Sequence, residues 1–306
     1  MTQRQLSLDG TAWLMLVGLS LVWGGSFFFV EVALAVLPPF TIVMARMTIG
    51  AFCLWAIVLA LRPAMPKDRR TWRDLLVMGV LNNTLPFCLI VAGQVWISGG
   101  LASVFNATTP LFGVIAAHYV TRDERLTANR LAGVLIGLAG VVVLIGPAVL
   151  GDIGEQALGS AMVLLAAMSY ATAGLWGRRL RHLPPLSAAT GQASCSAAIL
   201  IPLALAFDHP WDLAMPPLEV WAALAGLGFF STAVAYLLFF AVLRRAGGSN
   251  AMLVTLMVPP SAILLGVLVL GEPVSAEQLA GMVLVGLGLV AIDGRAVARL
   301  KRLYRP

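Results

Sequence analysis

Charged residues are scarce in this sequence. Asp, Glu, Lys and Arg together make up 11% of the 306 residues, against about 25% in an average soluble domain. Hydrophobic residues make up 60%. Apolar runs of about 20 residues recur along the chain, and each is long enough to cross the hydrocarbon core of a bilayer as a helix. The composition excludes a soluble globular protein and predicts an all-α membrane protein.

Cysteine and histidine are equally sparse, with three of each. Cys53, Cys88 and Cys195 lie in apolar segments without Cys-x-x-Cys spacing, so we expect buried thiols rather than disulfides or metal ligands. The chain has no His-Glu-x-x-His, no Gly-x-Ser-x-Gly and no Walker loop. We therefore expect no cofactor, no bound metal and no enzymatic activity, with an intramembrane lipid-modifying enzyme as the minor alternative.

Ten apolar segments are predicted to span the membrane, joined mostly by short connections. They cover roughly residues 12–35, 39–61, 74–96, 100–120, 128–147, 157–177, 185–207, 218–242, 249–270 and 276–293. Short connections make sequential helices antiparallel neighbours.

The distribution of basic residues supports this span count. Of the 20 Lys and Arg residues, all except Arg46 fall in the loops and tails of one side. The opposite loops carry acids such as Asp152, Glu155 and Asp208 but no Lys or Arg. The positive-inside rule then places both termini in the cytoplasm, including a basic tail at 294–306. Membrane topology thus explains the net charge of +6, and we expect no nucleic-acid partner.

The chain also repeats itself. Residues 99–145 align without gaps on residues 247–293, and Leu37-Pro38-Pro39 is matched by Leu183-Pro184-Pro185. Trp72 and Gly79 are matched by Trp221 and Gly228. The predicted units are a first five-helix repeat at 1–147 and a second at 157–293. Because five is odd, the second repeat enters the membrane inverted, and inverted repeats place a binding site near the midplane between the halves.

These features resemble the EamA repeat of the drug/metabolite transporter superfamily. They are the paired five-helix units, Trp23-Gly24 in the first span, the prolines Pro110 and Pro259-Pro260, and the Glu-x-[LV]-[ST] turn that leads to Leu-Ala-Gly. The resemblance covers nearly the whole chain. It implies an inner-membrane carrier of ten helices that exports metabolites, with amino acids as the best-known substrates, as in YddG-type exporters. The second repeat departs from the first at Tyr170, which replaces Trp23, and at Gln192, which replaces Arg46.

Two charged residues lie well inside predicted spans, away from the span ends. Arg46 is the only basic one, and Glu31 is the only acid well inside a span. A charge at that depth is costly unless it is paired or hydrated. Because spans one and two fold back at Pro38-Pro39, both side chains lie at similar depth and we expect an ion pair. Three roles stay open: a structural clamp, Arg46 binding a substrate carboxylate, or Glu31 taking up a proton.

Uncharged polar and aromatic residues gather near mid-depth of several spans. Taken one at a time, such groups are typical of ordinary interhelical hydrogen bonds. Taken together they predict the lining of a wet cavity suited to a small zwitterion. The candidate substrate-binding residues are Trp23, Arg46, Asn82, Asn83, Asn106, Thr109, Tyr170, Gln192, Tyr236 and Thr255, with Glu31 as the candidate coupling residue.

The sequence therefore predicts a secondary transporter of the inner (plasma) membrane that exports small metabolites. Amino acids, aromatic or hydrophobic ones in particular, are the expected substrates, and transport would proceed by alternating access around a midplane cavity. The alternative is a proton-coupled exporter of cationic drugs or other metabolites that uses Glu31. The expected partners are a small-molecule substrate and the lipid bilayer. Glycines in spans five and ten predict close-packing faces that serve as scaffold or as a homodimer contact.

Overall fold

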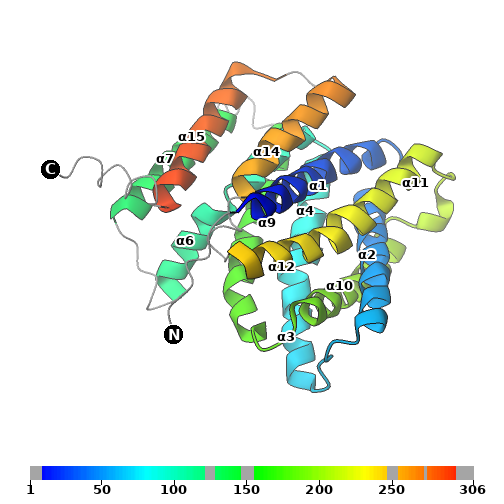
Figure 1. Ribbon diagram of the computed structural model, residues 1–306. Helices are drawn as coiled ribbons and strands as arrows, with labels where there is room; N and C mark the ends of the chain where they lie inside the picture. Colours follow the sequence, from blue (N-terminus) through cyan, green and yellow to red (C-terminus); the bar gives the residue numbers. More distant parts are fainter. Residues whose placement is uncertain (1–8, 121–127, 146–154, 247–253, 272–273, 294–306) are drawn as a thin grey trace, which may run out of the picture.

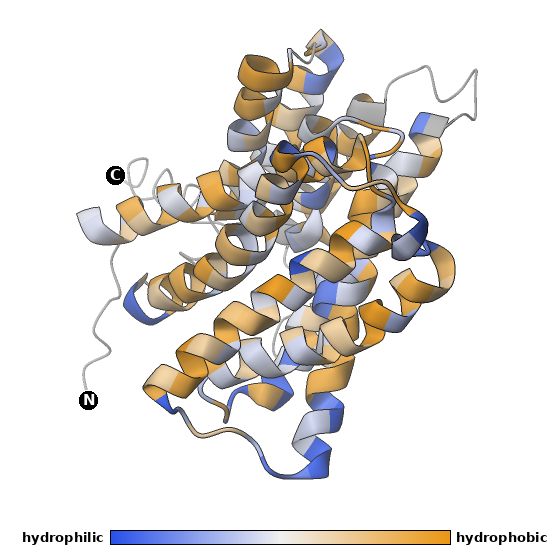
Figure 2. Ribbon diagram, turned by 90° about the vertical axis from the view of Figure 1, so that its right-hand side faces the viewer, coloured by the Kyte–Doolittle hydropathy of each residue, from blue (hydrophilic) through white to orange (hydrophobic). Residues whose placement is uncertain are grey.

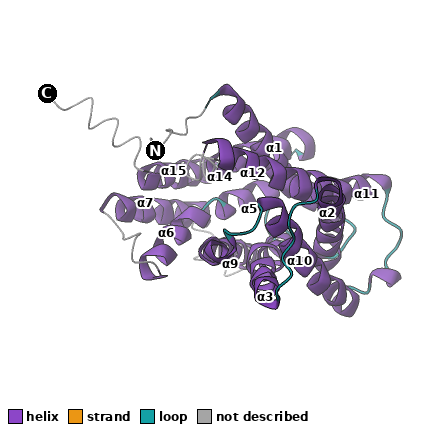
Figure 3. Cartoon of the chain, turned by 60° about the horizontal axis from the view of Figure 1, so that its bottom comes forward, coloured by secondary structure: helices purple, strands orange, loops and turns teal. Residues whose placement is uncertain are grey.

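The computed structural model describes residues 9–120, 128–145, 155–246, 254–271 and 274–293. Helices make up nearly all of these residues, and none of them forms a strand (Figure 3). The basic tail at 294–306 and the turns that hold Glu124 and Glu272 lie outside the described residues.

The helices follow one another with short connections (Figure 1). In chain order they are α1 (Gly10–Leu34), α2 (Pro39–Leu61), α3 (Arg69–Gly79), the π-helix η1 (Val80–Thr84), α4 (Leu85–Gly93), α5 (Gly99–Asn106), α6 (Thr109–Val120), α7 (Ala128–Ile145), α9 (Glu155–Trp176), the 3-10 helix η2 (Gly177–Leu180), α10 (Pro185–Phe207), the 3-10 helix η3 (Pro210–Asp212), α11 (Leu218–Ala225), the π-helix η4 (Gly226–Val234), α12 (Ala235–Ala246), α14 (Val254–Leu265), the π-helix η5 (Gly266–Leu270) and α15 (Ala276–Asp293).

The ten predicted spans correspond to apolar helical stretches. Among the described residues, seven stretches are long and apolar enough to cross a membrane, and three shorter apolar helices cover Leu131–Val143, Met257–Leu270 and Ala276–Gly288. The shorter ones match predicted spans five, nine and ten. Apolar residues cover the sides of the helices, while hydrophilic residues gather at helix ends and connections (Figure 2). Large side chains such as Phe52 and Leu268 are more than 70% exposed, as expected for a surface that faces lipid.

Local signals in the sequence set several helix ends. Pro39 occupies the first position of α2, where its missing N–H costs nothing. The sequence Ser275-Ala276-Glu277-Gln278 forms a capping box that opens α15: Ser275 N donates to Gln278 Oε1 at 3.0 Å, and Gln278 N donates to Ser275 Oγ at 3.2 Å. The three cysteines are free, as predicted, although they are half-buried rather than fully buried.

The two halves pack on each other in matched pairs. α2 packs on its equivalent α10, and α7 packs on its equivalent α15. The contact of α1 with α14 is matched by that of α9 with α6, and the contact of α4 with α9 by that of α12 with α1. If each helix is replaced by its equivalent in the other half, every one of these contacts becomes a contact that is also present. This is the relation expected of two inverted five-helix repeats. The exact unit boundaries stay a prediction.

Glycines allow α7 and α15 to approach closely. A Cβ on Gly140 would lie 2.7 Å from Val285 N, and a Cβ on Gly288 would lie 2.6 Å from Gly133 O and from Gly137 N. The predicted small-residue faces of these helices are thus used within one chain.

Polar contacts tie helices together at both ends of the bundle. Asp9 caps α1 and accepts from Arg245 of α12, with Nη2 and Oδ2 2.6 Å apart. The hydrogen bond from Arg245, followed by that from the Ala12 amide, lowers the pKa of the Asp9 carboxyl. At the other end, Asp208 after α10 accepts from Thr41 N at 2.6 Å and from Thr41 Oγ1 at 3.0 Å.

Candidate functional site

Arg46 is the most unusual buried group of the described residues. Its side chain lies where α2 packs on the π-helix η4, and the residue is only 6% exposed. Arg46 Nε donates to Thr232 Oγ1 at 3.2 Å, and Nη2 donates to the carbonyl of Ser231 at 3.4 Å. The guanidinium carbon lies 3.8 Å from the centre of the Phe87 ring, a favourable cation–π geometry.

The expected ion pair between Arg46 and Glu31 is wrong. Glu31 Oε2 instead accepts from the amide of Gly99, the first residue of α5, at 3.1 Å. Next to it, Gln94 Nε2 donates to the Phe27 carbonyl at 3.0 Å. Among the described residues, no carboxylate lies within ion-pair distance of Arg46. Its positive charge is therefore buried with neutral acceptors only.

Phe27 and Glu31 are four residues apart, so they share one face of α1. That face packs on the connection between α4 and α5, whereas Arg46 points from α2 toward η4. The expectation of a pair came from the similar distance of both residues from Pro38-Pro39, but their helices direct the two side chains toward different neighbours.

A cluster of amides lies beside Arg46, built from η1, α10 and α12. Asn82 Nδ2 lies 3.3 Å from both Gln192 Oε1 and Tyr236 Oη, and donates to them. Tyr236 Oη donates to Asn83 Oδ1 at 2.8 Å, and Asn83 Nδ2 donates to Ser196 Oγ at 3.2 Å. Asn83 is fully buried and Gln192 is 4% exposed. These polar groups satisfy one another directly, so the cluster is closed in this conformation.

Two π-helices present this polar set. η1 carries Asn82 and Asn83, and η4 carries Ser231 and Thr232. The Thr232 hydroxyl donates to the carbonyl of Leu227, five residues earlier, at 2.9 Å. A π-turn shifts side chains relative to a regular α-helix and is frequent at functional sites. A π-turn occurs at equivalent positions of both repeats, η1 and η4. The two turns bring the polar groups together between the halves.

Aromatic rings connect two further candidates to the cluster. The Trp23 ring lies 5.7 Å from Phe239, which lies 5.8 Å from Phe240, and Phe240 stacks on Tyr236 at 6.2 Å between ring centres. Tyr170 from α9 meets Phe87 edge-on at 6.4 Å. Tyr170 thus packs on the ring that faces the guanidinium, whereas Trp23 is connected to Tyr236 only through Phe239 and Phe240.

The remaining candidates lie on other helices. Asn106 ends α5 and Thr109 begins α6; Thr109 Oγ1 donates to the Asn106 carbonyl at 2.7 Å. Asn106 Oδ1 is buried and has no hydrogen-bond partner within the described part of the chain. Thr255 is the second residue of α14 and is half-buried. None of the interactions described above connects these three residues to Arg46.

Two residues that contact Arg46 or the amide cluster, Phe87 and Ser196, were not predicted from the sequence. Phe87 and Ser196 carry no polar or charge anomaly that would single them out. The repeat did contain a signal for Phe87, because a shift of 149 residues carries it onto Tyr236, just as it carries Gly79 onto Gly228.

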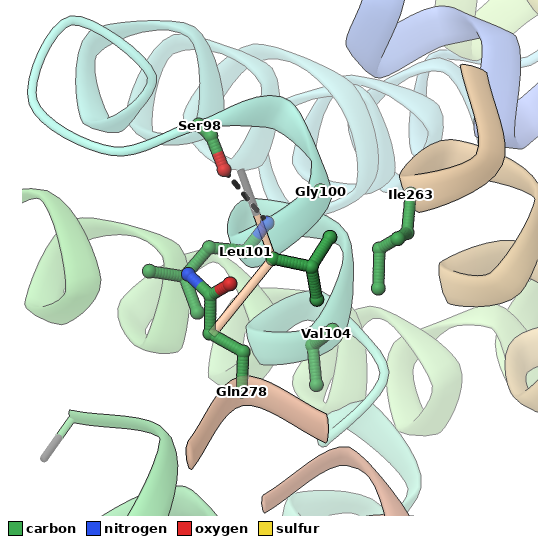
Figure 4. Close-up of a pocket in the computed structure, with 7 residues that line it drawn as sticks. Ser98, Gly100, Leu101, Val104, Ile263 and Gln278 are labelled. Carbon is green, nitrogen blue, oxygen red and sulfur yellow. Dashed lines mark hydrogen bonds between the residues drawn. The ribbon is translucent and has the colours of Figure 1, made fainter. Parts of the chain in front are cut away.

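Two hollows elsewhere in the described structure lack the chemistry of such a site. One lies at the start of α5, where Leu101 N donates to Ser98 Oγ and Gln278 and Ile263 approach from α15 and α14 (Figure 4). Its volume is about 10 Å³, roughly that of one water molecule. The other, about 340 Å³, is lined by apolar residues of α1, η4 and α14, including Phe28 and Phe29. Neither offers a group that would hold a charged solute.

Glu31 gives the first testable prediction. The Glu31→Gln change keeps an oxygen that can accept from the Gly99 amide. We therefore expect the wild-type melting temperature and a transport rate within about twofold of the wild type. Glu31→Ala removes the acceptor at the start of α5 and should lower the free energy of unfolding by about 1–2 kcal/mol. Thermal melting and transport between pH 5.5 and 8 check this expectation. Transport that loses its pH dependence in Glu31→Gln would instead establish a coupling role.

The fold and site define a class of protein. A bundle of apolar helices, built from two repeats that meet at a buried polar cluster, is the architecture of a membrane transporter. The comparison with known families agrees, because the EamA-like transporter family matches residues 10–146 and again residues 157–292. The chain belongs to the EamA-like transporter family.

Individual relatives are similar over nearly their whole length. A probable amino-acid metabolite efflux pump of Salmonella typhimurium is 28% identical over 96% of this chain and 98% of its own. The uncharacterized transporter YoaV of Bacillus subtilis is 24% identical over 90% of this chain and 94% of its own. The uncharacterized inner membrane transporter YedA of Escherichia coli is 25% identical over 85% of this chain and 83% of its own. One solved crystal structure superposes with a TM-score of 0.68 over 95% of this chain and 99% of its own, at 20% identity, and so shares the fold.

Proposed function

We propose that this protein is a secondary transporter that exports small carboxylate-bearing metabolites, with apolar and aromatic amino acids as its substrates. One observation carries the proposal: among the residues that the structure describes, the buried guanidinium of Arg46 bonds to neutral groups only, Thr232 and the Ser231 carbonyl. A buried cation without a counter-ion is costly. A substrate carboxylate would supply the missing charge and a bidentate partner for the guanidinium fork.

The surroundings of Arg46 fit the rest of an amino acid. Asn82, Gln192 and Tyr236 provide amide and hydroxyl oxygens for an ammonium group, while Phe87 and Tyr170 border the guanidinium with rings. The name of the Salmonella relative, a probable amino-acid metabolite efflux pump, indicates the same substrate class and outward transport for that protein.

The same proposal covers mechanism and location. The polar cluster lies between halves that are related by inversion, so rocking them against each other would expose it to one side of the membrane at a time. The closed, internally bonded cluster then corresponds to an occluded state without substrate. We place the protein in the inner membrane with both termini in the cytoplasm, acting as a carrier and not as an enzyme.

The proton-coupled export of cationic drugs fits the described site less well. A cationic substrate needs an acid in the binding cluster, and Glu31 is bonded to the Gly99 amide instead. The side chains around Arg46 described above are neutral.

A homodimer through spans five and ten stays a prediction. Gly140 and Gly288 already serve the contact between α7 and α15 within one chain. A dimer would therefore use the opposite faces of these helices, where Leu135 is 60% exposed and Val283 is 58% exposed.

Counterflow in proteoliposomes tests the proposed function. Vesicles that contain the purified protein are loaded with an unlabelled amino acid, and uptake of a panel of labelled amino acids is followed. We expect uptake of labelled phenylalanine or leucine above that of protein-free vesicles. Absence of uptake for every amino acid of the panel would overturn the proposal.

A further inference from the structure

The pseudo-two-fold relation of the halves maps the surroundings of Arg46 onto those of Gln192. A shift of 146 residues carries Arg46 on α2 onto Gln192 on α10, and a shift of 149 carries Asn82 on η1 onto Ser231 on η4. The contacts follow the same exchange: Arg46 bonds to the carbonyl of Ser231, and Gln192 bonds to Asn82. The two positions are equivalent places in one site.

The backbone at both positions is equally constrained. A Cβ on Gly79 would lie 2.8 Å from the carbonyl oxygen of Gln192, and a Cβ on Gly228 would lie 3.2 Å from the carbonyl oxygen of Arg46. These two glycines are themselves repeat equivalents. Close approach of the end of α3 to α10 and of η4 to α2 therefore holds both side chains between the halves.

A ring lies beside each position as well. Phe87 lies under the guanidinium of Arg46, and its repeat equivalent Tyr236 shares the donor Asn82 with Gln192. The surroundings match, while the charge does not: one half offers a guanidinium and the other a neutral amide.

We propose that the Arg46/Gln192 pair sets the charge of the transported solute, so that the site selects substrates with a single carboxylate. This inference rests on the proposed function. The neutral amide of Gln192 accepts the uncharged or ammonium-bearing part of the substrate opposite the carboxylate. A second cation at position 192 converts the site into one for dicarboxylates, and an anion there occupies Arg46 in place of the substrate.

The spacing is suitable for this discrimination. Thr232, which bonds Arg46, and Tyr236, which shares the donor Asn82 with Gln192, are four residues apart on η4 and α12, so their backbones are separated by a rise of about 6 Å. A five-carbon dicarboxylic acid separates its two carboxylates by a distance of this order. At about 6 Å and an effective dielectric constant of about 20, a charge changes affinity by up to about a hundredfold.

The test compares leucine and glutamate, which have similar size but differ by one carboxylate. Counterflow rates of both labelled amino acids are measured with the wild type, Gln192→Arg, Gln192→Glu and the neutral control Gln192→Met. We expect Gln192→Arg to raise the ratio of glutamate to leucine transport by about tenfold or more. Gln192→Glu, which keeps the size of the side chain, should lower leucine transport by about tenfold or more, because the new carboxylate pairs with Arg46. Gln192→Met removes the amide acceptor without adding a charge, so the rates for leucine and glutamate should fall together and their ratio should stay within about twofold of the wild type.

Each outcome decides something different. An unchanged ratio in Gln192→Arg, or wild-type leucine transport in Gln192→Glu, overturns the inference while the proposed function stands. If Gln192→Arg fails to insert into the membrane, the isosteric Gln192→Glu variant decides alone. If the wild type transports no amino acid, the proposed function fails and the inference falls with it.

Discussion

Replacement of Arg46 by glutamine should lower the rate of amino-acid counterflow by about 30-fold or more while the protein stays folded. Removal of one partner from a buried hydrogen-bonded charge pair costs about 2–5 kcal/mol of binding free energy. Glutamine fits the site, because the equivalent position of the other repeat already holds Gln192 between the equivalent elements α10 and η1. The measurement is the initial counterflow rate of labelled leucine, normalised to the amount of inserted protein.

The stability of the same variant separates binding from a structural role. Arg46 bonds neutral groups only, so its removal relieves an uncompensated buried charge. Arg46→Gln should therefore melt at the wild-type temperature or above it. A folded variant with wild-type transport would exclude a role in binding. A variant that no longer inserts or folds would instead show that Arg46 clamps α2 to η4.

The second large effect concerns the contact between α7 and α15. Replacement of Gly288 by alanine places a Cβ 2.6 Å from two backbone atoms, Gly133 O and Gly137 N. Backbone atoms cannot move aside as a flexible side chain can, so the helices must separate. We expect the free energy of unfolding to fall by about 1–3 kcal/mol, the usual cost of overpacking. Thermal melting in detergent measures the difference.

The same helix offers a matched control for this variant. A Cβ on Gly286, two residues earlier on α15, would meet nothing within 4 Å. Gly286→Ala should be neutral or stabilising by up to about 1 kcal/mol, because alanine favours the helix over glycine. Equal melting temperatures for Gly286→Ala and Gly288→Ala would contradict the packing of α7 on α15 described above.

Most of the fold was predictable because a membrane leaves few choices. Apolar runs can cross a bilayer only as helices or closed barrels, and the repeat fixed how the two sets of five helices relate. The capping box at Ser275 was predictable because it depends on residues close in the sequence. The break between α5 and α6 lies just before Pro110, but the sequence does not state at which residue the helical hydrogen bonds stop.

The candidate site was predictable as a set of residues but not as a set of contacts. Helical rise places Glu31 and Arg46 at one depth, yet it does not state which way each side chain faces. Glu31 faces the start of α5, and Arg46 faces η4. The π-turns depend on a single inserted residue in each helix and leave no pattern in the hydrophobic periodicity.

The most direct test of the carboxylate site is a comparison of leucine with its decarboxylated amine, 3-methylbutylamine, as competitors in counterflow. The two compounds share the apolar side chain and the ammonium group, and only leucine can pair with Arg46. Excess leucine should abolish uptake of labelled leucine, while the amine at the same concentration should leave it nearly unchanged. Equal or stronger inhibition by the amine would contradict the assignment of Arg46 as the group that binds the substrate.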